Sequence, residues 1–137
     1  MRITDLRETK RGRMAVDVEG DFCFAMHPEV FAACGWSVGD EVEPDELAEA
    51  QYRSELRICK DKALRLLSGQ DYTRNQLLER LCRTQDPTAA EEAVERMEEL
   101  GLVDDRSYAM RCARDLVGLR AFSPRRVEQE LRRRGVD

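Results

Sequence analysis

The 137-residue chain is highly charged, with 37% Asp, Glu, Lys and Arg and a formal net charge of −5 at pH 7. This length fits one domain, or two short helical units, and allows a modest hydrophobic core. No apolar run is long enough to cross a bilayer and no basic-then-apolar leader begins at Met1, so the composition predicts a soluble protein that stays in the cytoplasm.

The cysteines are odd in number and widely spaced, and they form no Cys-x-x-Cys pair. This pattern indicates reduced thiols in a cytosol, and it predicts neither a metal site nor a cofactor. Three of them, Cys59, Cys82 and Cys112, fall on apolar stripes of predicted helices, where a buried thiol behaves as a small hydrophobic group.

The charges form blocks of opposite sign along the chain. Segments 53–83 and 106–137 carry net charges of +4 and +5, whereas 43–52 and 84–105 carry −4 and −7. Such a chain can present basic and acidic faces separately, which suits a partner made of protein plus nucleic acid better than naked duplex DNA.

Residues 1–43 differ in kind from the rest. Two short β-favouring runs, Met14–Val18 and Phe22–Met26, flank Glu19-Gly20-Asp21 and predict a hairpin with the glycine in its turn. A preceding strand near Arg2–Leu6 would complete a three-stranded meander.

A short helix over Pro28–Cys34, closed by Gly35, is expected after the meander. His27 has no second ligand within helical reach, so it is interpreted as a turn residue and not as a metal ligand. Phe31 and Trp36 are expected to pin the hairpin to the first helix.

The first long helix is expected to open at Pro44, since proline is tolerated at a first helical position and Asp45 and Glu46 follow where the helix dipole favours negative charge. Ser68-Gly69 should end it, with the glycine in the left-handed conformation. Apolar residues at helical spacing predict its buried stripe: Tyr52, Leu56, Cys59, Ala63, Leu66 and Leu67.

Two shorter helices are expected next, opened by capping boxes at Thr73 with Gln76 and at Thr88 with Glu91. The second should stop at Gly101, after which Asp104 or Asp105 caps a further helix. It is expected to bury Ala90, Val94, Met97 and Leu100 and to expose an acidic face of Glu91, Glu92, Glu95, Glu98 and Glu99.

The pattern then starts again with an offset of 50 residues. Between 63–83 and 113–133 four residues are identical and five more are conservative, and Thr73 matches Ser123 as a helix cap. We interpret this as a three-helix unit used once completely over about 53–101 and once incompletely, because residue 137 falls where the next third helix would begin.

The sequence therefore predicts a mostly α fold, with tandem three-helix repeats, the second incomplete, preceded by a small N-terminal β-hairpin or meander. The expected divisions are 1–43 for the β region with its short helix, 44–103 for the first long helix and repeat 1, and 104–137 for the incomplete repeat 2. The last helix, which ends at the exposed residues Gly135-Val136-Asp137, is expected to fray for want of an element that covers Val127 and Leu131.

No catalytic motif accompanies these elements. The chain has no phosphate-binding glycine loop followed by Lys-Ser/Thr, no His-Glu-x-x-His and no serine elbow, so an enzyme is not expected.

Three stretches, ALRLLSGQDYTRNQLLERL, MEELGLVDDRSYA and FSPRRVEQELRRRGV, resemble the RecX regulatory proteins over roughly residues 50–137. The resemblance implies a curved stack of three-helix repeats in the groove of a RecA–single-stranded-DNA filament. There such proteins inhibit ATP hydrolysis, strand exchange and filament extension, and so modulate homologous recombination, DNA repair and the SOS response. The implied partners are the RecA filament and the single-stranded DNA bound with it, with no membrane; we expect a monomer. Longer members carry about three repeats, so a shorter stack should span fewer filament subunits.

Arginines of the two repeats are the candidate contacts with RecA or nucleic acid. The last predicted helix carries an arginine cluster offset only by Glu128 and Glu130, and guanidinium groups recognise phosphate and carboxylate. A curved stack would gather the arginines on a common surface: Arg57, Arg74, Arg80, Arg83, Arg125, Arg126, Arg132 and Arg133.

Two other interpretations stay open at this point. One is a stand-alone DNA-binding module of short helix pairs, which the net charge of −5 disfavours because phosphate contacts supply most non-specific affinity. The other is a helical scaffold that binds protein only.

Overall fold

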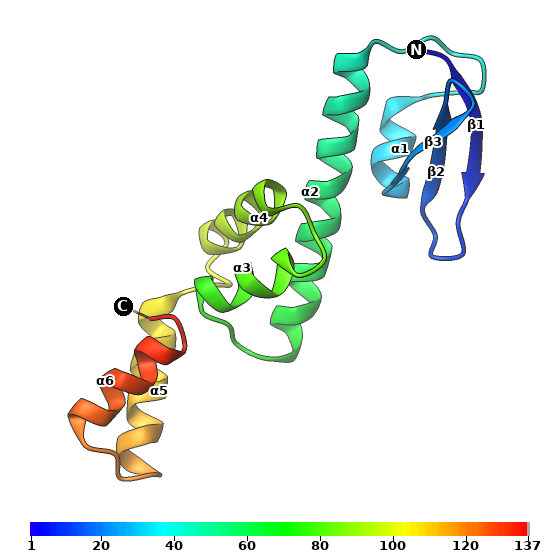
Figure 1. Ribbon diagram of the computed structural model, residues 1–137. Coiled ribbons are helices and arrows are strands. Elements are labelled where there is room, and N and C mark those ends of the chain that lie inside the picture. Colours follow the sequence, from blue (N-terminus) through cyan, green and yellow to red (C-terminus); the bar gives the residue numbers. More distant parts are fainter. Residues whose placement is uncertain (137) are drawn as a thin grey trace. The chain divides into compact units, whose positions relative to one another are not determined.

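The computed structural model describes residues 1–136, which contain three strands and six helices (Figure 1). The contacts divide the chain into two compact units, Met1–Ile58 and Cys59–Asp137, and α2 (Pro44–Gly69) contributes its first part to one and its last part to the other. The predicted mostly α fold with a small N-terminal meander is confirmed. The divisions predicted from the repeats follow a different criterion from these compact units and stay a prediction.

The N-terminal sheet is an antiparallel meander in the order β1-β2-β3. Val18 pairs with Asp21, so Glu19 and Gly20 alone form the turn, with φ of 54° and 86°. Two consecutive positive φ values are what a two-residue hairpin turn of matching twist requires, and Gly20 adopts its value without strain. The predicted hairpin is confirmed, and the strands are β1 (Ile3–Glu8), β2 (Met14–Val18) and β3 (Asp21–Met26).

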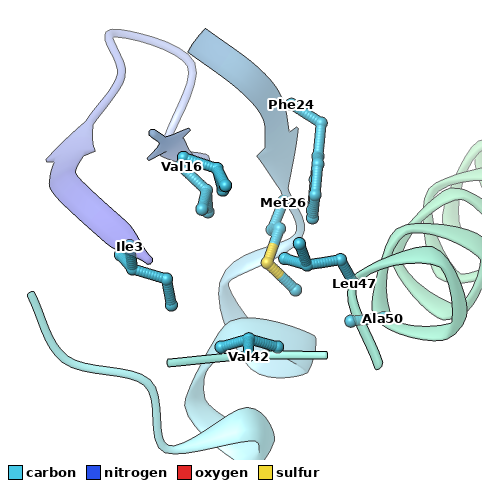
Figure 2. Packing of buried hydrophobic residues seen from close by; sticks show 8 residues of the cluster. Ile3, Val16, Phe24, Met26, Val42, Leu47 and Ala50 are labelled. Carbon is cyan, nitrogen blue, oxygen red and sulfur yellow. The ribbon is translucent and has the colours of Figure 1, made fainter. Parts of the chain in front are cut away.

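One face of the sheet is buried under two helical segments. Ile3, Val16 and Met26 are fully buried, and Leu47 and Ala50 from the first part of α2 belong to the same cluster (Figure 2). Alternation along the strands sends every second side chain to this face, so the apolar cluster fixes the register.

Helix α1 (Pro28–Cys34) has the predicted bounds and is closed by Gly35 in the left-handed conformation. His27 caps it, since its Nδ1 accepts a hydrogen bond from the Glu29 backbone N–H at 3.1 Å. Phe31 and Trp36 pack, half-buried, against the cluster of the sheet. Their predicted packing role and the turn position of His27 are both confirmed.

Helix α2 begins at Pro44 with Asp45 and Glu46 in its first turn, as predicted. The prediction for its end was wrong in one respect. Gly69 is not left-handed; instead the Ser68 hydroxyl donates to the Arg65 carbonyl at 2.7 Å in the last turn. Of the predicted stripe, two residues are fully buried and the rest half-buried: Cys59 and Ala63, then Tyr52, Leu56, Leu66 and Leu67.

Helix α3 (Arg74–Cys82) opens with the predicted capping box between Thr73 and Gln76. The cap predicted for α4 (Pro87–Glu99) was wrong. Asp86, and not Thr88, accepts the hydrogen bond from Ala89 N–H at 3.0 Å, because Pro87 takes the first helical position, where a missing N–H costs nothing.

The end of α4 follows the predicted glycine stop. Gly101 has a φ of 76°, and its N–H donates to the Glu98 carbonyl at 2.9 Å. Leu100, however, is 50% exposed, so its predicted burial was wrong; it follows the last turn, and Val103, at 3% exposure, is the buried residue of this connection.

Helices α5 (Asp105–Gly118) and α6 (Pro124–Arg133) are capped by Asp104 and Ser123. They enclose a small apolar cluster of their own at Cys112, Leu116 and Val127. Because Thr73 and Ser123 each cap the helix that begins at the next residue, the 50-residue offset persists in the structure. We call α3, α4 and the end of α2 repeat 1, and α5 with α6 repeat 2.

The end of the chain differs from its predicted exposure. Val136 is only 8% exposed, and the Gly135 carbonyl accepts a hydrogen bond from Asn75 Nδ2 at 3.0 Å. The prediction of an exposed Gly135-Val136 was therefore wrong, because this turn packs on the start of α3; Asp137 lies outside the described residues.

The cysteine prediction holds in part. Cys59 and Cys112 are buried as expected, whereas Cys82 is exposed at the end of α3, so its predicted burial was wrong. None of the helices among residues 1–136 combines the length and hydrophobicity needed to cross a membrane.

Candidate binding surface

The eight arginines predicted as contacts belong to both compact units. Arg57 lies on the part of α2 that packs with the meander, and its Nη2 is 2.6 Å from Glu29 Oε2 on α1. Both side chains are partly exposed, so this ion pair contributes little and Arg57 remains accessible to a stronger acidic ligand.

Arg74 is the most internally engaged of the set. Its Nε donates to Glu98 Oε1 at 2.8 Å, and its Nη2 donates to Glu91, so one guanidinium ties α3 to α4. The hydrogen bonds to Glu91 and Glu98 raise the pKa of Arg74. The side chain is 27% exposed, and two of the five glutamates of the predicted acidic face are thereby occupied within repeat 1.

The end of α3 carries Arg80 and Arg83, both exposed. Arg83 pairs with Glu79 one turn earlier at 3.5 Å, while Arg80 forms no ion pair with a residue of the described chain. A helical pair of this kind is worth only a few tenths of a kcal/mol, so both guanidinium groups are available to a partner.

The arginine run at the end of α6 is largely neutralised by its own helix. Arg132 pairs with Glu128 at 2.8 Å, while Arg133 and Arg134 share Glu130 at 2.5 and 3.0 Å. Hydrogen bonds from Arg133 and Arg134 lower the pKa of Glu130 to about 2. The run therefore presents less positive charge than its sequence indicates.

Arg125 and Arg126 differ from this run because no carboxylate of residues 1–136 pairs with either. The Arg126 guanidinium lies 3.9 Å from the centroid of the Phe122 ring, a cation–π contact that holds the charge at the start of α6. The first turn of α6 contains no acidic residue. Positive charge at a helix N-terminus opposes the dipole, so these arginines do not serve the stability of α6.

The predicted residues of unit Cys59–Asp137 thus fall at three places. Hydrogen bonds from Thr73 and Asn75 to the turn after α6 set the backbone of Arg74 beside the C-terminal end of α6, where Arg132 and Arg133 lie. Arg125 and Arg126 lie toward the opposite end of this ten-residue helix, about 12 Å away along its axis. Arg80 and Arg83 form the third group, at the end of α3.

Sequence reasoning missed a further exposed group on α5. Arg114 and Arg120 are exposed and form no ion pair within residues 1–136, and Met110, Val117 and Leu119 are 52%, 53% and 83% exposed. A shallow, mainly apolar hollow of about 530 Å³ lies here, lined by Met110, Ala113, Arg114, Val117 and Gly118. The available signal was that these apolar residues lie off the stripe that packs against α6.

The structure defines a protein with a three-helix unit, repeat 1, followed by the two helices of repeat 2, which carries exposed arginines that form no ion pair within residues 1–136. Comparison with known families gives the same division: residues 59–97 match the first three-helix domain of RecX, and residues 104–137 match the second. The chain belongs to the RecX family.

Individual relatives agree with this assignment. The regulatory protein RecX of Caldanaerobacter subterraneus subsp. tengcongensis is 28% identical over 96% of this chain and 67% of its own length. That of Clostridioides difficile is 26% identical over 98% of this chain and 65% of its own length, and that of Trichlorobacter lovleyi is 44% identical over 57% and 51%.

A crystal structure of regulatory protein RecX has the same fold, with a TM-score of 0.68 at 20% sequence identity, covering 99% of this chain and 68% of that one. The chain thus spans about two thirds, or less, of the relatives it matches. These relatives are named as regulatory proteins and not as enzymes.

Proposed function

We propose that this chain is a non-enzymatic cytoplasmic regulator that binds the RecA–single-stranded-DNA filament and inhibits its ATP hydrolysis, strand exchange and extension. Membership of the RecX family supports this role. The RecA–single-stranded-DNA filament is the partner implied by the resemblance of three sequence stretches to the RecX regulatory proteins. Regulation of recombination and DNA repair, including the SOS response, would follow from such inhibition.

The observation that carries the contact is the state of Arg125 and Arg126. They are exposed, lack a carboxylate partner within residues 1–136 and stand at a helix start that disfavours cations. A phosphate backbone or an acidic protein surface would relieve this repulsion, because arginine binds both ligands through two parallel hydrogen bonds. Arg80 and Arg83 are proposed as secondary contacts. Arg57, Arg74, Arg132 and Arg133 would first have to leave carboxylates of the chain itself.

The test is inhibition of DNA-dependent ATP hydrolysis by RecA over a range of regulator concentrations. We expect the double charge reversal Arg125→Glu/Arg126→Glu to raise the half-inhibitory concentration at least tenfold, a change of about 1.4 kcal/mol in binding free energy. Lys10→Glu/Arg11→Glu, at exposed positions of the β1–β2 turn, makes the same change in net charge and should leave inhibition unaltered.

Three results would count against the proposal, and the last two would each favour one of the other interpretations. No inhibition by the unmodified chain at several-fold molar excess over RecA would overturn the proposed function. Steep salt dependence of binding to duplex DNA without RecA would indicate a stand-alone DNA-binding module. Inhibition that survives the double reversal would indicate contact through another surface, as in a protein-only scaffold.

A further inference from the structure

Repeat 1 and repeat 2 are joined through the buried start of α3. The Thr73 side chain is fully buried, and its hydroxyl donates a hydrogen bond to the Arg134 carbonyl at 2.8 Å while accepting one from Gln76 N–H at 3.1 Å. A threonine hydroxyl has one proton to donate, so this group is committed both to its own helix and to the other repeat.

Neighbouring residues extend the same contact. Asn75 Nδ2 donates to the Gly135 carbonyl at 3.0 Å, and the Arg74 backbone N–H donates to Asp105 Oδ1 at 2.8 Å. The start of α3 is therefore bound to both ends of repeat 2, to the first residue of α5 and to the turn after α6. We call Thr73, Asn75, Asp105 and the turn Arg134–Gly135 the junction.

The junction leaves little room for a side chain at position 135. Gly135 has a φ of 91°, and a Cβ there would lie 3.0 Å from Asn75 Cβ and 3.2 Å from Thr73 Oγ1. The turn can approach α3 closely because position 135 carries no side chain. The turn approaches α3 closely, Gly135 is left-handed, and the side chains of Thr73 and Asn75 are hydrogen-bonded to the turn. Together these features indicate a specific contact.

Each repeat also has its own apolar packing, with Cys112, Leu116 and Val127 forming a separate cluster in repeat 2. The junction adds directional hydrogen bonds to the apolar packing of the buried Val136, whose turn lies on the start of α3. Hydrogen bonds to buried groups have strict geometry, so they specify one orientation where apolar contact would allow several.

We propose that the junction is a positioning element, which holds repeat 2 in the orientation that presents Arg125 and Arg126 to the filament. That this orientation serves binding rests on the proposed function. That the junction holds the orientation rests on the contacts of Thr73. Thr73 and Asn75 touch no partner themselves; they act by keeping the binding-competent orientation populated.

The orientation is measurable without any partner. In the isotopically labelled full chain, backbone ¹⁵N–¹H residual dipolar couplings fitted separately to α3–α4 and to α5–α6 report whether the repeats share one alignment. We expect a single alignment tensor for the unmodified chain and for Thr73→Ser, which keeps the hydroxyl. Thr73→Ala should require two tensors, because the repeats then reorient independently.

Ser123→Ala is the matched control. Ser123 caps α6 as Thr73 caps α3, but it is exposed and makes no hydrogen bond to repeat 1 within residues 1–136. Ser123→Ala removes a helix cap comparable to that of Thr73 and should leave the single alignment tensor unchanged. If Thr73→Ala does not fold, Asn75→Ala tests the same point, since it removes only the bond to Gly135 and leaves the α3 cap intact. An unchanged single tensor in the folded variant overturns the proposal, as does a second tensor in the unmodified chain.

Measuring the inhibition of RecA by the same variants separates this proposal from the proposed function. If loss of the junction leaves the competent orientation about one tenth populated, the half-inhibitory concentration against RecA rises about tenfold. Independent repeats with unchanged inhibition would overturn the positioning role. Failure of the Arg125 and Arg126 reversal to weaken inhibition would instead count against the proposed contact, while the dipolar couplings would still decide whether the junction fixes the repeats.

Discussion

Arg74 Nε on α3 lies 2.8 Å from Glu98 Oε1 on α4, and the same guanidinium also donates to Glu91 two helical turns earlier. One planar cation with several fixed donors thus spans two carboxylates, which a lysine ammonium could not do from one position. Arg74 is therefore first a tie between two helices of repeat 1, and any partner that binds it competes with both glutamates.

Replacing Arg74 by Lys should lower the free energy of unfolding by about 0.5–1 kcal/mol, because one of the two charge-assisted hydrogen bonds is lost in a partly exposed site. Urea unfolding followed by circular dichroism measures this change. Arg96→Lys is the control, since within residues 1–136 Arg96 pairs with a single carboxylate, that of the exposed Glu99 at 3.0 Å. Equal stabilities for Arg74→Lys and the unmodified chain would show that the double contact contributes nothing.

The pH dependence of stability should contain a component from Glu130. Its pKa is lowered from 4.5 to about 2 by hydrogen bonds from Arg133 and Arg134. A lowered pKa in the folded state means that this stabilisation is fully present above pH 4.5 and is lost as the pH falls toward 2. Glu130→Gln should therefore lower the melting temperature at neutral pH and flatten its fall between these pH values. Glu128→Gln removes a carboxylate from the same helix as a control, and identical pH profiles for the two variants would contradict the assignment.

Two glycines at helix ends should respond in opposite directions to alanine. Gly135→Ala places a Cβ 3.0 Å from Asn75 Cβ and strains a left-handed backbone, so it should lower the free energy of unfolding by about 2 kcal/mol. Gly118 ends α5 without a left-handed φ and with open space around it. Gly118→Ala should raise stability by about 0.5–1 kcal/mol. Thermal unfolding of both variants measures the contrast, which a destabilised Gly118→Ala would contradict.

Local signals in the sequence predicted most of the fold. Capping residues and prolines at helix starts act within four residues of the chain. The capping box of Thr73 with Gln76, the start at Pro44 and the cap at Ser123 could therefore be assigned correctly without knowledge of the tertiary structure. The wrong cap at Thr88 arose because two local signals overlapped, and the Asp86-Pro87 pair prevailed.

The binding surface was harder to predict because the positive charge that an arginine presents depends on whether a carboxylate, often distant in the sequence, pairs with it. The engagement of Arg74 depends on Glu91 and Glu98, which lie on another helix. The junction joins Thr73 to the backbone carbonyl of a residue 61 positions away. Every residue has a backbone carbonyl, so the sequence does not indicate which one accepts this hydrogen bond. Periodicity therefore located the arginines on helices but not the carboxylates that neutralise some of them.

The separate core of repeat 2 gives a last prediction. Val127, which is 6% exposed, packs with Cys112 and Leu116, and Val136 is the other buried apolar residue of repeat 2 within residues 1–136. Val127→Ala removes two methyl groups from this cluster and leaves a cavity that a small core fills poorly, so it should lower the free energy of unfolding by about 2 kcal/mol. Val117→Ala deletes the same atoms from a side chain that is 53% exposed and should change stability by less than about 0.5 kcal/mol. Because the two valines lie in the same repeat and lose the same atoms, their difference measures burial alone. Equal losses would mean that α5 and α6 share no core, and repeat 2 would then depend on the junction for its stability as well as for its orientation.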